Sequence, residues 1–172
     1  MNDYWTWRTL EGGALTKPGI QGFPGLEAAQ ALLLEAIADL NLDGIPSAVD
    51  LSARGGAVVL ALRALGIHAV GTDDAASSLL ALRQLGIADD GATHGLGIRT
   101  LSGERGNARV YAELHALWTR LKPNGVALIA GDKDKGFERY LKTAVEWFGE
   151  GEVIWRSKGF RVARLLNTRL EP

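Results

Sequence analysis

Cysteine is absent from this sequence of 172 residues, which excludes disulfide bonds and thiolate metal sites. No apolar run approaches the roughly 20 residues that a transmembrane helix needs, and the first residues lack the layout of a signal peptide. We therefore expect no membrane association and a reducing, cytoplasmic setting. The three histidines, His68, His94 and His115, show no ligand spacing, so we predict no metal site.

Several motifs of nucleotide and hydrolytic enzymes are also missing. The sequence contains no Gly-x-Gly-x-x-Gly and no phosphate-binding loop with its lysine, which argues against dehydrogenases and NTPases. No serine lies in a Gly-x-Ser-x-Gly context, so hydrolysis by a Ser-His-Asp triad is disfavoured.

The apolar pattern that is present is typical of a single α/β domain covering residues 1–172. Residues 1–25 are expected to form an irregular arm, with Tyr4, Trp5 and Trp7 packed onto the body. Helical and strand periods alternate, which favours a largely parallel sheet with a closing antiparallel hairpin. We predict helices over 26–42, 57–65, 75–85, 107–121 and 137–148, strands over 47–51, 67–72, 96–101, 126–130, 152–156 and 160–166, and turns at 122–125 and 157–159.

Two acidic residues end the first two predicted strands. Asp50 ends the first strand, Asp73 ends the second, and a loop containing glycine follows Asp50. In sheets of this kind ligands bind outside the carboxyl ends of the strands. Because an ionised carboxylate offers two acceptor oxygens, Asp73 is suited to hold both hydroxyls of a ribose.

Positive charge is concentrated in the second half of the chain. Residues 1–98 carry 5 Lys/Arg and 11 Asp/Glu, whereas residues 99–172 carry 14 and 9. The loop 131–136 precedes a helix, so its N–H groups are expected to hold an anion. The candidates for RNA binding are Lys133, Lys135, Arg139 and Lys158. The alternative is that these charges only keep the surface solvated.

The segment Asp50-Leu-Ser-Ala-Arg-Gly-Gly56 resembles motif I, Asp-Leu-Gly-x-Gly-x-Gly, of the class I S-adenosylmethionine-dependent methyltransferases. Val70–Asp73 resembles the strand that supplies the acid for the adenosine ribose. Segments 16–20, 32–35, 121–125 and 128–135 are similar to the small methyltransferase domain of ribosomal RNA guanine-N2 methyltransferases.

This resemblance covers about residues 14–167. It implies a Rossmann-like three-layer sandwich with a mostly parallel, seven-stranded sheet. It also implies S-adenosylmethionine as the cofactor, held by Asp50, Ser52, Gly56 and Asp73 where that site is retained.

Two departures from the family bear on activity. Active members carry Asn-Pro-Pro and an aromatic residue after strand four, to hold the amine that is methylated, whereas the five prolines here include no adjacent pair. Arg99–Asn107 occupies that place, and we assign no catalytic residue. A cation at Arg54 would repel the sulfonium of the cofactor, unless its side chain turned to solvent or neutralised Asp50.

In these departures the sequence is similar to the degenerate half of duplicated family members, a half that supports the other half or contacts RNA. Our leading hypothesis is therefore a non-catalytic domain that binds ribosomal RNA or a partner such as an active methyltransferase subunit. Two alternatives stay open: an active methyltransferase with an atypical site, and a scaffold that forms homo-oligomers and covers its crevice with the aromatic arm.

Overall fold

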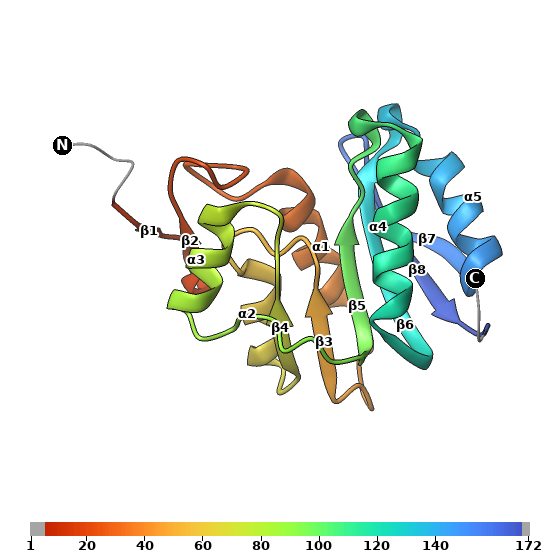
Figure 1. Cartoon of the computed structure of the whole chain (residues 1–172), viewed down its shortest axis with the longest axis horizontal. Coiled ribbons are helices and arrows are strands. Elements are labelled where there is room, and N and C mark those ends of the chain that lie inside the picture. Colours follow the sequence, from red (N-terminus) through yellow and green to blue (C-terminus); the bar gives the residue numbers. More distant parts are fainter. Residues whose placement is uncertain (1–5, 170–172) are drawn as a thin grey trace.

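The computed structural model describes residues 6–169, which form a six-stranded sheet with helices on both faces and a separate two-stranded pair (Figure 1). The strands are β1 Arg8–Thr9, β2 Leu15–Thr16, β3 Ser47–Asp50, β4 His68–Gly71, β5 His94–Thr100, β6 Leu121–Asp132, β7 Gly149–Ser157 and β8 Phe160–Asn167. The α-helices are α1 Ala28–Asp39, α2 Ala57–Ala64, α3 Ala76–Gln84, α4 Asn107–Thr119 and α5 Phe137–Phe148. Three short 3-10 segments are η2 Glu11–Gly13, η3 Gly103–Arg105 and η4 Lys133–Lys135.

The strand order β4-β3-β5-β6-β8-β7 confirms the predicted α/β class. Strands β3, β4, β5 and β6 are parallel to one another. The hairpin β7–β8 is antiparallel, and β8 inserts between β6 and β7. The carboxyl ends of the four parallel strands therefore meet at one edge of the sheet, which we call the carboxyl edge.

The expected number of seven strands is wrong, because the sheet formed within residues 6–169 has six. Beyond β4, the chain makes only an isolated bridge between Gly71 and Ala88. Directly after that bridge, the side chains of Asp89 and Asp90 accept the N–H groups of Gly91 and Ala92. These local turns bend the backbone away from an extended course, so no further strand forms here.

Each face of the sheet has its own hydrophobic core. On one face α1 and α2 bury Leu33, Val59 and Leu62 against strand residues such as Leu96 and Leu128. On the other face, where Figure 1 shows α4 in front of β6, α4 and α5 form a second cluster. Its fully buried members include Val110, Leu114, Leu117, Phe137, Tyr140 and Phe148. The sheet is thus buried between two helical layers.

The N-terminal arm is more regular than expected. Strands β1 and β2 pair antiparallel, and Leu15 and Ile20 pack against Ala81 of α3. Trp7 is half-buried, and the Lys17 ammonium lies 4.2 Å from the centroid of its ring, so the expected packing of this side chain is confirmed. The predictions for Tyr4 and Trp5 lie outside the described residues.

The segment Lys122–Gly125 lies inside β6, although we predicted a turn. Its first three residues are exposed, and Asn124 has a φ of 60°. The pairing with β5 shifts here, from His94 opposite Leu121 to Leu96 opposite Val126. The Pro-Asn-Gly sequence therefore bulges out of a strand instead of ending it.

Two kinds of feature are missing from residues 6–169. No helix there combines the length and hydrophobicity that a bilayer crossing requires. The same residues contain no group of three or more His, Asp or Glu side chains placed to hold a metal ion.

Candidate functional site

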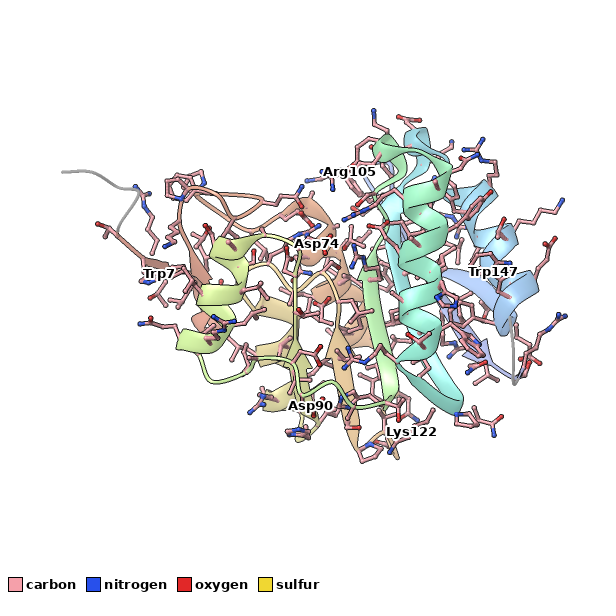
Figure 2. The ribbon with its side chains drawn as sticks, in the orientation of Figure 1. Trp7, Asp74, Asp90, Arg105, Lys122 and Trp147 are labelled. Atoms are coloured by element: carbon pink, nitrogen blue, oxygen red, sulfur yellow. The ribbon has the colours of Figure 1, made fainter. Side chains whose placement is uncertain are left out.

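The carboxyl edge carries the predicted ligand-binding residues. Asp50 is the last residue of β3, and Asp73 follows β4. Figure 2 shows Asp74 and Arg105 at this edge, whereas Asp90 and Lys122 lie at the opposite edge. Asp50 and Asp73 therefore lie at the edge where the sequence placed them.

Asp50 is an internal anchor with 1% exposure. Its carboxylate accepts the Ser52 N–H at 3.0 Å, and both the Ser52 hydroxyl and the Gln30 amide donate to it at 3.4 Å. Burial raises the pKa of Asp50 from 3.8 to about 6, although these hydrogen bonds oppose the shift. Asp50 therefore holds the loop together and is shielded from solvent.

Ser52 and Gly56, two residues of the loop after β3, have structural roles. The Ser52 hydroxyl accepts the Thr100 N–H at 2.8 Å, which ties the end of β3 to the end of β5. Gly56 has a φ of 94°, and a Cβ there would lie 2.8 Å from Cδ1 of Ile87. Ser52 therefore supplies a hydrogen bond that a glycine could not make, whereas Gly56 is required by its positive φ and by its close packing against Ile87.

Arg54 binds two carboxylates inside the site. Its backbone N–H and its Nη1 both donate to Oδ2 of Asp73 at 3.0 Å, and its Nε donates to Oε2 of Glu27 at 2.9 Å. Although burial disfavours its charge, Glu27 and Asp73 raise the pKa of Arg54. The expected alternative of a side chain in solvent is therefore wrong. The ion pairs of Arg54 are with Glu27 and Asp73, although its charge also acts to lower the pKa of Asp50.

Glu27 is a site residue that the sequence did not reveal. It precedes α1, 27 positions before Arg54, and belongs to no motif. Its side chain is 16% exposed, and burial raises its pKa despite the opposing charge of Arg54. Only the packing of α1 beside the β3 loop shows that it faces Arg54.

Arg54 lies between two cavities at the carboxyl edge. One has a volume of about 360 Å³ and is lined by Glu27, Thr100 and Phe160. The other has a volume of about 330 Å³ and is lined by Asp73, Ser78 and Arg99. Four residues line both cavities: Gln21, Arg54, Ser102 and Glu104.

An ion-pair network occupies the segment after β5, where active family members carry Asn-Pro-Pro. Buried Glu113 of α4 accepts Nη2 of Arg99 at 2.7 Å, and Ser102 donates its N–H and its hydroxyl to the same carboxylate. Arg99 also donates to the Leu51 carbonyl at 3.0 Å. Arg109 joins the network through Asp74. No clamp for an exocyclic amine is formed by these groups.

The predicted RNA-binding residues come together only in part. Lys133 and Lys135 of η4 and Lys158 of the β7–β8 turn are exposed, and the Lys133 N–H donates to the Gly159 carbonyl at 2.8 Å, so the two segments are neighbours. Arg139 instead donates to the Asn107 side chain and lies over the Tyr140 ring.

The anion site expected in the loop 131–136 is partly filled by the chain itself. The Asp132 carboxylate accepts the Asp134 N–H at 2.8 Å, and the Gly136 N–H donates to the Lys133 carbonyl. Gly103 of η3 lies against the backbone of Lys135, and Arg105, which the sequence did not single out, is the last residue of the same short segment.

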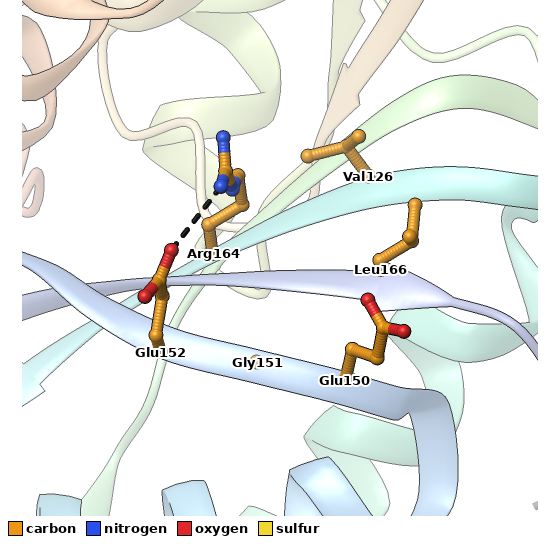
Figure 3. Close-up of a pocket in the computed structure, with 6 residues that line it drawn as sticks. All are labelled: Val126, Glu150, Gly151, Glu152, Arg164 and Leu166. Carbon is orange, nitrogen blue, oxygen red and sulfur yellow. Dashed lines mark hydrogen bonds and ion pairs between the residues drawn. The ribbon is translucent and has the colours of Figure 1, made fainter.

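A third cavity, of about 480 Å³, lies on strands β6, β7 and β8 (Figure 3), and Asp73 is not among its lining residues. It is lined by Val126, Gly151 and Leu166, with an ion pair of 3.2 Å between Arg164 and Glu152. It contains none of the predicted site residues.

Comparison with known proteins gives structural relatives only. No protein-family model matches the chain, and no curated protein does. The T. thermophilus 16S rRNA N2 G1207 methyltransferase RsmC, solved with AdoMet and guanosine, superposes with a TM-score of 0.84 at 28% identity. That match covers 99% of this chain and 47% of RsmC, so the chain spans about half the length of that protein.

Two other solved structures share the fold at lower identity. The ribosomal protein L11 methylase of Lactobacillus delbrueckii subsp. bulgaricus has a TM-score of 0.60 at 15% identity and covers 83% of each chain. Human N-acetylserotonin methyltransferase, solved with SAM, has a TM-score of 0.61 at 13% identity and covers 83% of this chain and 52% of its own. The fold is that of the class I methyltransferases.

The arrangement around Arg54 does not fit the cofactor of these relatives. Oδ2 of Asp73 already accepts two donors from Arg54, and Oδ1 accepts the Ala75 N–H at 3.0 Å. One lone pair is left for a ribose that offers two hydroxyls. The guanidinium would also stand beside a sulfonium, with repulsion that partial burial strengthens.

Proposed function

We propose that this chain is a methyltransferase-fold domain that does not transfer methyl groups and instead binds RNA at the carboxyl edge. The observation that carries the proposal is that the Arg54 guanidinium pairs with both Glu27 and Asp73. Asp73 is the acid that would otherwise hold a ribose. The Glu113 network after β5 supports it, because that network leaves no amide or carbonyl clamp for a methyl acceptor.

The RNA-binding surface we propose is the basic edge, defined as Arg105, Lys133, Lys135 and Lys158. All four side chains are exposed, and none has a hydrogen bond or ion pair within residues 6–169. Unpaired cations release counterions when they meet phosphates, which favours binding to RNA. The rRNA methyltransferase RsmC, as a relative of this fold, supports RNA over other polyanions.

The half-length match to RsmC supports a second partner. A domain without its own cofactor site can contribute to RNA methylation by binding the RNA, while an active methyltransferase in the same polypeptide or in another subunit transfers the methyl group. We propose that this chain orients RNA for such a partner.

The test is RNA affinity measured by fluorescence anisotropy on hairpin and single-stranded RNA of about 20 nucleotides. In K133E/K135E/K158E we expect a loss of roughly tenfold or more and a shallower salt dependence, because phosphate contacts are removed. The matched control R83E/K122E/K142E reverses three exposed cations on other surfaces and should keep most of the affinity. An equal loss in both variants would contradict a defined RNA surface.

The retained Asp50, Gly56 and Asp73 at the ends of β3 and β4 favour one other candidate, an active methyltransferase with an atypical site. Calorimetric titration of the wild-type chain with S-adenosylmethionine separates the two. We expect no binding, and tight binding would overturn the non-catalytic proposal. If binding occurs but D73A leaves the affinity unchanged, the active candidate with this site is rejected as well.

A further inference from the structure

We infer that Arg54 is an internal ligand whose side chain closes a nucleoside cleft that is otherwise intact. The inference rests on the proposed function, because it explains why the cofactor is excluded, and it adds that one side chain is responsible. Of the four residues that line both cavities, Arg54 alone is held by ion pairs to two carboxylates, and its side chain is 15% exposed.

The cleft on both sides of Arg54 keeps unused polar groups. The Ser78 hydroxyl is fully buried, has no hydrogen-bond partner and lines the cavity beside Asp73. In the other cavity, Oε1 of Glu27 and the Thr100 hydroxyl are buried without partners. Native proteins pair nearly all buried polar atoms, so these three groups point to a ligand with several donors and acceptors.

The sizes of the two cavities agree with such a ligand. Each, at about 330 and 360 Å³, reaches only the lower limit of ordinary small-molecule sites, which is roughly 300 to 1,000 Å³. Removing the Arg54 side chain would join them and free Asp73 and Glu27. The joined cleft would present carboxylates and hydroxyls to the sugar and amino groups of an adenine nucleoside.

The loop itself should survive the removal. Arg54 has a φ of 52°, which costs an ordinary residue about 1–2 kcal/mol and glycine little. R54G therefore suits the backbone and leaves Asp73 with two N–H donors, from residues 54 and 75. R54G leaves the Glu27 carboxylate without its counter-ion. The second substitution E27Q avoids this cost, because glutamine carries no charge.

The experiment is calorimetric titration of the full chain with S-adenosylhomocysteine, which lacks the sulfonium charge. We expect no binding to wild type, and for R54G an affinity higher by roughly tenfold or more. R83A is the matched control, since it removes an exposed arginine of α3 that lines neither cavity. It should behave as wild type, and R54G/D73A should lose the gained affinity.

Each result separates the two proposals. If R54G folds but does not bind S-adenosylhomocysteine, the internal-ligand inference is overturned, and the proposal of a non-catalytic RNA-binding domain is unaffected. Equal binding by wild type and R54G overturns both, because the cleft would be open already. Circular dichroism checks folding, and if R54G unfolds, R54G/E27Q replaces it under the same criteria.

Discussion

At the scale of single residues, the loop after β3 binds its own chain where a cofactor loop leaves donors for a ligand. Ser52 and Arg54 stand where the family motif has glycine, and each side chain pairs with another part of the chain. A glycine at position 52 would leave the Thr100 N–H without its partner, and a glycine at position 54 would remove the guanidinium from Asp73. Both side chains thus bond within the chain, as the proposed loss of the cofactor site requires.

Asp50 predicts a pH dependence of stability. Its pKa is 3.8 unfolded and about 6 folded, so the folded chain holds its proton more tightly. Stability from this group is complete below pH 3.8 and is lost as pH rises through 6, by on the order of 3 kcal/mol. In D50N, which cannot ionise, this loss should disappear, so the variant should gain on wild type between pH 4 and 7.

Urea unfolding at several pH values measures this difference. D134N, which changes an exposed carboxylate, is the control and should follow the wild-type curve. A constant gap between D50N and wild type across the range would show that Asp50 titrates normally.

At the scale of elements, α4 fixes the conformation that follows β5. Glu113 of α4 accepts hydrogen bonds from both Arg99 and Ser102, one at the end of β5 and one just beyond it. Because Glu113 is 3% exposed and Arg99 is 8% exposed, the pair depends on its own hydrogen bonds instead of water.

E113A should therefore lower the free energy of unfolding by up to about 3–5 kcal/mol, the usual effect of breaking a buried ion pair, because Arg99 then keeps only the exposed Asp74 as a carboxylate partner. E146A is the control: Glu146 is exposed on α5, so its loss should change stability by less than about 0.5 kcal/mol. Both are measured by urea denaturation. A loss for E113A no larger than that for E146A would mean that the network contributes little.

At the scale of the whole molecule, two cores share one sheet. Leu128 and Ala130 of β6 face the cluster under α1 and α2, whereas Ala127 and Ile129 face the cluster under α4 and α5. Disruption of either helical layer therefore exposes strands that the other layer needs.

We predict that residues 1–172 unfold in a single cooperative transition. Trp155 packs against the first cluster, and Trp118 and Trp147 pack against the second. The fluorescence midpoints of W155F and of W118F/W147F should each coincide with the far-ultraviolet circular dichroism midpoint of the same variant. Two separated midpoints would show that the layers unfold independently.

The sequence by itself determined the class of fold and the edge at which Asp50 and Asp73 meet. The periods of helices and strands are local, and the acids at strand ends must meet wherever parallel strands do, so Asp50 and Asp73 were found without coordinates. The boundary of α5 was also correct, because Gly136 and Gly149 delimit a strongly amphipathic segment.

Only the tertiary structure decided what the site does with those acids. Glu27, Arg54 and Asp73 are separated by 27 and 19 positions, and no period or motif connects Glu27 with the other two. Their ion pairs arise because α1, the β3 loop and the end of β4 are packed at one edge, where buried charges must find partners. The sequence showed that an arginine stood in the cofactor loop, and the packing showed that this arginine binds the carboxylate suited to the ribose.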